Sequence, residues 1–133
     1  MKTQIKKIAI NTGGGDAPGL NAVIRAATIS ALAKGWEVLG IRDGFNGVLQ
    51  PELYRPEYPG VLNLDRRAVR GITHLGGTIL GTTNRGNPLA FPVQKENGEF
   101  ELVDRCPELV ERLRKLGVDA LVAIGGDGSM KIA

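Results

Sequence analysis

The chain has 133 residues and a formal net charge of +3 at pH 7, and 42% of its residues are hydrophobic, as in ordinary globular domains. Acidic and basic residues are interspersed, so the basic stripe of nucleic-acid-binding proteins is absent, and no apolar run is long enough to cross a membrane. The single cysteine, Cys106, excludes an internal disulfide, and the first residues do not resemble a signal peptide. We therefore expect a cytoplasmic protein that binds neither nucleic acid nor membranes.

The first part of the chain has the pattern of a βαβ unit. Lys7–Thr12 reads as a buried strand, and a glycine-rich turn follows it at 13–19. Apolar residues then recur at helical spacing from Leu20 until Gly35, and Glu37–Ile41 is a second apolar strand. Strands joined in this way run parallel, so we predict a Rossmann-like α/β fold: a parallel sheet with flanking helices.

The middle of the chain is less regular. Residues 50–63 contain three prolines without periodicity, so we predict irregular structure there, and then a short helix over 64–70. Residues 76–86 form a second glycine-rich loop, of a kind that binds phosphate. The Asn-Gly pair at 97–98 between short apolar runs predicts a β-hairpin with strands at 91–94 and 99–103.

The last part of the chain is predicted to contain a helix, a strand and a third glycine loop, in that order. Pro107 opens a helix that ends at Gly117, and 118–124 reads as a strand buried on both faces. The loop at 125–129 follows directly, and its glycines let backbone N–H groups approach a phosphate. Asp127 would repel a bare phosphate, so its presence favours a divalent metal between them. The alternative is a tight turn in which Asp127 and Ser129 cap the helix that begins there.

Two common nucleotide-binding fingerprints are excluded. From Gly13 the dinucleotide pattern requires a glycine where the chain has Pro18, and from Gly14 the P-loop pattern lacks its lysine. The first loop still ends a strand and opens a helix, where free N–H groups favour an anion. Asp16 in this loop is a candidate helix cap or, less well placed than Asp127, a metal ligand.

Three segments in order resemble the N-terminal part of 6-phosphofructokinases: 14–21, 76–82 and 125–129. A lone Gly-Gly-Asp-Gly would be less specific, because NAD kinases and lipid kinases carry a similar motif. The resemblance implies that residues 1–133 are the incomplete, truncated ATP-binding part of an ATP-dependent 6-phosphofructokinase, without the rest of this domain or the second domain. It also implies a homotetramer for full-length relatives.

The implied reaction transfers the γ-phosphoryl group of ATP to the 1-hydroxyl of fructose 6-phosphate, with Mg²⁺. By the resemblance, Gly14 contacts the nucleotide phosphates, and Arg85 with Gly86 touches the nucleotide. The residues implied to cradle phosphate are Gly126, Asp127, Gly128 and Ser129. Asp127 is also the implied metal ligand, and glycine at 128 indicates ATP as donor, since pyrophosphate-using relatives typically have aspartate there.

The chain also departs from the family pattern. The catalytic aspartate of the family is expected beyond Ala133, so we predict that these residues alone do not turn over substrate. Arg25 and Arg66 match arginines of the family's allosteric site, but Ile29 stands where the family has a further arginine. Two alternatives stay open: another kinase with a Gly-Gly-Asp-Gly motif, acting on NAD or a lipid, and a non-catalytic nucleotide-binding fragment.

Overall fold

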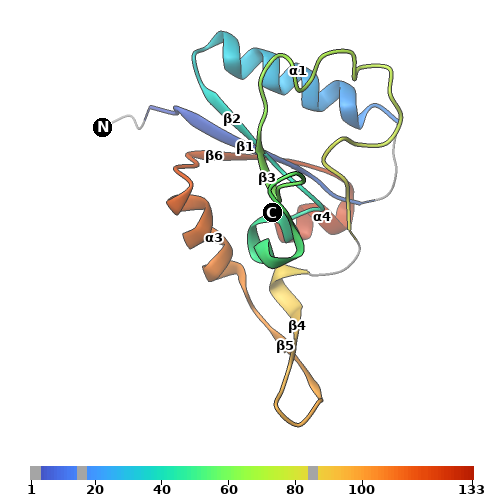
Figure 1. Cartoon of the computed structure of the whole chain (residues 1–133), viewed down its shortest axis with the longest axis vertical. Helices are drawn as coiled ribbons and strands as arrows, with labels where there is room; N and C mark the ends of the chain where they lie inside the picture. Colours follow the sequence, from blue (N-terminus) through green and yellow to red (C-terminus); the bar gives the residue numbers. More distant parts are fainter. Residues whose placement is uncertain (1–3, 15–17, 84–86) are drawn as a thin grey trace.

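The computed structural model describes residues 4–14, 18–83 and 87–133. A four-stranded sheet has the order β3-β2-β1-β6, and β4 and β5 form a separate hairpin that extends from the body of the domain (Figure 1). The strands are β1 (Lys7–Thr12), β2 (Glu37–Ile41), β3 (Val61–Asn63), β4 (Phe91–Gln94), β5 (Phe100–Val103) and β6 (Ala120–Ile124). The helices are α1 (Leu20–Ala33), α2 (Asn46–Leu49), α3 (Cys106–Lys115) and α4 (Asp127–Ile132), with short 3-10 turns η1 (Pro51–Leu53) and η2 (Pro88–Ala90).

The predicted α/β fold is confirmed. β1 lies between β2 and β6 and pairs parallel with both, so that Ile10 is opposite Gly40 on one side and Val122 on the other. The carboxyl ends of β1 and β6 therefore lie at the same edge of the sheet. The predicted hairpin is also confirmed, and its turn closes through a 3.0 Å hydrogen bond from Gly98 N to the carbonyl oxygen of Lys95.

The sheet is mixed rather than wholly parallel. The prediction of irregular structure over 50–63 is also wrong in part. β3 pairs antiparallel with β2 and adds an edge strand. Three residues after a proline-rich stretch are too few to show a strand periodicity. The helix predicted over 64–70 is also wrong, since this segment forms successive turns. Asp65 Oδ1 accepts a 2.7 Å hydrogen bond from Ala68 N, as a helix N-cap does, but the turns end at Gly71, whose φ is 73°.

The core has two parts, one on each face of the sheet. Under α1 lie Ile8, Ile10, Ile24, Val38, Leu64, Val69 and Leu80. The opposite face is covered by α2 and α3 and contains Ala9, Leu39, Ile41, Leu49, Phe91 and Leu109. β1 is buried on both faces as predicted, but β6 is only half-buried along its whole length. The predicted full burial of β6 is wrong because β6 is the outer strand of the described sheet.

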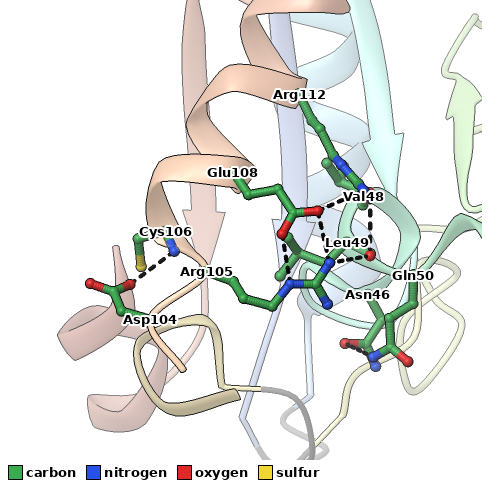
Figure 2. Close-up of polar contacts among 9 residues, drawn as sticks. All are labelled: Asn46, Val48, Leu49, Gln50, Asp104, Arg105, Cys106, Glu108 and Arg112. Atoms are coloured by element: carbon green, nitrogen blue, oxygen red, sulfur yellow. Dashed lines mark hydrogen bonds and ion pairs between the residues drawn. The ribbon is translucent and has the colours of Figure 1, made fainter. Parts of the chain in front are cut away.

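A charged network ties α3 to the end of α2 (Figure 2). Arg112 Nη1 donates to the carbonyl oxygen of Val48 at 2.7 Å, and Arg105 Nη2 donates to that of Leu49 at 3.0 Å. Glu108 lies between the two arginines, 2.8 Å from Arg105 Nε and 2.6 Å from Arg112 Nη2. The last carbonyls of a helix lack partners within it, so the arginines supply bonds that α2 needs. Among the described helices, none is long and apolar enough to cross a membrane.

Glu108→Gln tests this network through the pH dependence of the free energy of unfolding. The hydrogen bond from Arg105 holds the pKa of Glu108 below its usual value, against the opposing effect of burial. A lowered pKa stabilises the fold above the unfolded-state value of about 4.3 and loses that effect as pH falls through the folded-state value. We expect the substitution to lower the free energy of unfolding at pH 7 by at most about 1 kcal/mol, because the carboxylate is half-exposed. The difference should shrink below about pH 4 in urea titrations.

The matched control is Glu111→Gln. Glu111 pairs with Lys115 at 3.2 Å, but both side chains are about 70% exposed. Its removal should change stability little at either pH. If Glu108→Gln lowers the free energy of unfolding equally at pH 7 and pH 3, the ionic role assigned to Glu108 is contradicted.

Candidate functional site

Two of the glycine-rich loops touch at the carboxyl ends of β1 and β6. Gly13 N donates a 2.8 Å hydrogen bond to the carbonyl oxygen of Ile124, which extends the strand pairing into the loops. A Cβ at position 14 would lie 3.2 Å from Gly126 N, so the two backbones approach too closely to leave room for a side chain there. The loops thus lie together at the edge of the sheet where the sequence places them.

Glycine is required where these loops cross. A Cβ at position 125 would lie 2.7 Å from the carbonyl oxygen of Gly13 and 2.6 Å from Ser129 Cβ. A Cβ at position 13 would overlap Ser129 Oγ. Gly126 and Gly128, in contrast, have no atom of the described residues within 4 Å of a Cβ position. The glycines at 13 and 125 therefore allow the loops to pack, while those at 126 and 128 leave backbone open.

The start of α4 has backbone donors that lack acceptors within the helix. Gly126 is its N-cap residue, and no side chain among the described residues caps the helix. The first hydrogen bond within the helix runs from Met130 N to the carbonyl oxygen of Gly126 at 3.1 Å, which leaves the N–H groups of 127–129 without helical acceptors. The alternative in which Asp127 and Ser129 cap this helix is therefore wrong. Free N–H groups at a helix start suit an anion.

Asp127 is exposed at this helix start, next to the open backbone of Gly126 and Gly128. Within the part of the chain that the structure describes, no group of three or more His, Cys, Asp or Glu side chains gathers in one place. Mg²⁺ is commonly held by one or two carboxylates together with phosphates and water. A single exposed carboxylate beside free amides fits an ion shared with a bound phosphate.

The middle glycine loop lies against the base of the first loop. Thr12 Oγ1 donates to the carbonyl oxygen of Gly81 at 2.8 Å, and lies 2.9 Å from Thr78 Oγ1. Asn21, at the start of α1, accepts a 2.7 Å hydrogen bond from Ile79 N and donates to the carbonyl oxygen of Leu75 at 3.1 Å. Thr12 and Asn21 are buried, and the sequence motifs alone assign them no structural role. Their polarity at otherwise apolar positions is the signal that could have found them.

Several predicted site residues are not brought together by the described structure. Arg85 and Gly86 lie outside the described residues, as does Asp16. The N-cap position of α1 is occupied by Gly19, and the roles considered for Asp16 stay predictions. Arg25 is half-buried on α1 and Arg66 is exposed in the turns after β3, and their allosteric role stays a prediction.

Glycine loops at the carboxyl ends of adjacent parallel strands place the chain in the class of α/β domains whose ligand sites lie at that edge of the sheet. The family model for phosphofructokinase matches residues 7–133. The chain therefore belongs to the phosphofructokinase family, as its motifs indicate.

Similar proteins agree with this assignment. The chain is 49% identical over its whole length to ATP-dependent 6-phosphofructokinase 2 of Clostridium perfringens, and covers 34% of that protein. It is 46% identical to ATP-dependent 6-phosphofructokinase 1 of a Nostoc species over 96% of the chain and 33% of the relative. The crystal structure of Pichia pastoris phosphofructokinase in the T-state matches 98% of the chain, at a TM-score of 0.73 and 32% identity, and the match covers 12% of that structure's chain. The chain thus spans about a third of the length of the curated relatives it matches.

Gly125→Ala tests the packing of the two loops. The added methyl group meets Gly13 backbone and the Ser129 side chain, so we expect a loss of about 1–3 kcal/mol in the free energy of unfolding. In ¹H–¹⁵N NMR spectra the amide signal of Gly13 should also move. The control, Gly126→Ala, adds the same methyl group into open space and should leave both measurements nearly unchanged. Equal effects of the two substitutions would contradict the described loop contact.

Proposed function

We propose that this chain is the MgATP-binding part of an ATP-dependent 6-phosphofructokinase that phosphorylates the 1-hydroxyl of fructose 6-phosphate. The observation that carries the proposal is the contact between the 13–14 and 125–129 loops, with Asp127 exposed beside free backbone amides. The names of the curated relatives support the same donor and reaction type. We further propose that the full-length protein acts in the cytoplasm as a homotetramer.

The proposed roles follow from the charge of a nucleotide's phosphates. Backbone N–H groups of Gly14 and of 126–129 donate hydrogen bonds to phosphate oxygens, and Asp127 holds the metal ion beside them. Mg²⁺ supplies neutralisation of the negative charge that develops on the transferring group. Positioning and charge neutralisation are most of what phosphoryl transfer requires. Arg85 and Gly86 are proposed further contacts to the nucleotide. None of these groups accepts the proton of the sugar hydroxyl, and we assign that step to the longer protein.

Gly128 is the proposed determinant of the phosphoryl donor. No described atom lies within 4 Å of a Cβ at this position, so the loop leaves room next to the first turn of α4. An aspartate there would bring a second negative charge beside Asp127 and crowd the α-phosphate of ATP. The small, uncharged residue therefore favours ATP over pyrophosphate.

The alternative functions differ in their support. A kinase acting on NAD or a lipid is disfavoured, because the phosphofructokinase family model covers residues 7–133. A nucleotide-binding protein without catalysis keeps the same site, and differs only in the absence of turnover when fructose 6-phosphate is supplied to the full-length protein.

Asp127→Asn tests the proposed metal-dependent site by calorimetric titration with ATP in excess Mg²⁺. We expect at least about a tenfold loss of affinity, because one carboxylate ligand of the ion is neutralised while the side-chain shape is retained. The matched control is Asp104→Asn, which removes the same charge from an exposed residue before α3 and should bind as the unsubstituted chain does. Equal affinity for Asp127→Asn, or no binding by the unsubstituted chain, would overturn the proposal.

A further inference from the structure

Asp43, two residues after β2, has an unusual backbone conformation. Its φ is 53°, and among the described residues it is the one non-glycine with a positive φ. Side chains disfavour this region, and residues adopt it where the surrounding structure holds them there. The contacts of Asp43 therefore indicate what this conformation maintains.

The Asp43 carboxylate joins two segments that are distant in sequence. Its Oδ2 accepts a 2.8 Å hydrogen bond from the hydroxyl of Tyr54, which is half-buried. Its Oδ1 lies against Gly81, where a Cβ would overlap this oxygen. Asp43 N also donates to the carbonyl oxygen of Leu80 at 2.8 Å. Burial, and then the hydrogen bond to Asp43, raise the pKa of Tyr54, so the phenol stays a protonated donor.

The segment that carries Tyr54 is itself held in place. The Tyr54 and Tyr58 rings stack with centroids 6.4 Å apart. The guanidinium of Arg42 lies 3.8 Å from the centroid of the Tyr58 ring, and Arg42 Nε donates to the carbonyl oxygen of Pro59 at 2.8 Å. The Tyr54 hydroxyl is thus presented to Asp43 from a fixed direction.

Gly81 connects this arrangement to the first glycine loop. The carbonyl oxygen of Gly81 accepts from Thr12 Oγ1, and Thr12 directly precedes Gly13 and Gly14. The 78–83 loop therefore contacts Asp43 on one side and Thr12, at the start of the first glycine loop, on the other.

We propose that Asp43 and Tyr54 are positioning residues whose hydrogen bond sets the 78–83 loop against Thr12 and so raises the affinity of the site for MgATP. The inference rests on the proposed function, since it assigns a consequence for the same nucleotide site. Neither residue is assigned a contact with the nucleotide.

Tyr54→Phe removes the donor and keeps the ring that stacks on Tyr58. We expect about a tenfold weaker affinity for MgATP, as for loss of one hydrogen bond to a charged group. We also expect faster hydrogen exchange at the amides of Asp43 and Gly81, measured without nucleotide. The matched control is Tyr58→Phe, which deletes a hydroxyl that makes no hydrogen bond in the described part of the chain and keeps the ring under Arg42.

Substitutions at Asp43 separate the effect of its carboxylate from the effect of its backbone conformation. Asparagine and glycine both tolerate a positive φ, but only asparagine keeps an oxygen that accepts from Tyr54. We expect Asp43→Asn to lose less affinity and protection from exchange than Asp43→Gly, because its neutral oxygen still accepts a weaker hydrogen bond, and Asp43→Gly to match Tyr54→Phe. If Tyr54→Phe does not fold, Asp43→Gly against Asp43→Asn provides the same comparison.

The outcomes distinguish this inference from the proposed function. If the unsubstituted chain binds MgATP and Tyr54→Phe binds it equally well, the inference alone is overturned, even where hydrogen exchange is faster. If the unsubstituted chain does not bind MgATP, the proposed function falls, and the claim about affinity falls with it. Weaker binding together with faster exchange, and neither change in Tyr58→Phe, supports the inference.

Discussion

The parallel pairing of β1 with β6 holds the candidate site together. It joins Thr12 to Ile124, and the hydrogen bond from Gly13 N to the carbonyl oxygen of Ile124 continues it beyond the strands. Two glycine loops from opposite ends of the chain are thereby brought into backbone contact. Without that pairing, each loop would be an isolated turn with amides pointing to solvent. With it, amides from both loops and the Asp127 carboxylate share one edge of the sheet.

The remaining elements support this edge from two sides. On one face, Thr12 and Asn21 hold the 75–81 segment over β1 and α1 through side-chain hydrogen bonds to backbone. On the other, Arg105 and Arg112 bind the last carbonyls of α2 and so fix the helix that follows the Asp43 loop. In the described part of the site, these supports hold backbone in place through buried or half-buried side chains. Such rigidity suits a reaction in which alignment and charge neutralisation matter most.

The sequence predicts the regular part of this fold well. The apolar runs of β1 and β2, the helical spacing of α1 and the Asn-Gly turn are local signals, and each appears in the structure near its expected bounds. β3 and the exposure of β6 depend on which strands become neighbours, which local patterns do not encode. The bonds of Thr12 to Gly81 and of Asn21 to Ile79 join residues 69 and 58 positions apart, so no periodicity could reveal them. The glycine loops were identifiable as a candidate phosphate site, but the close approach of their backbones was not.

If the proposed function holds, the 13–14 and 125–129 loops act together on one nucleotide. Titration of the ¹⁵N-labelled chain with MgATP, followed by amide chemical shifts, measures whether they do. We expect the largest shift changes to occur together at Gly13, Gly14 and 125–129, with one shared dissociation constant. Changes confined to one loop, or centred on the β4–β5 hairpin, would contradict a shared nucleotide site.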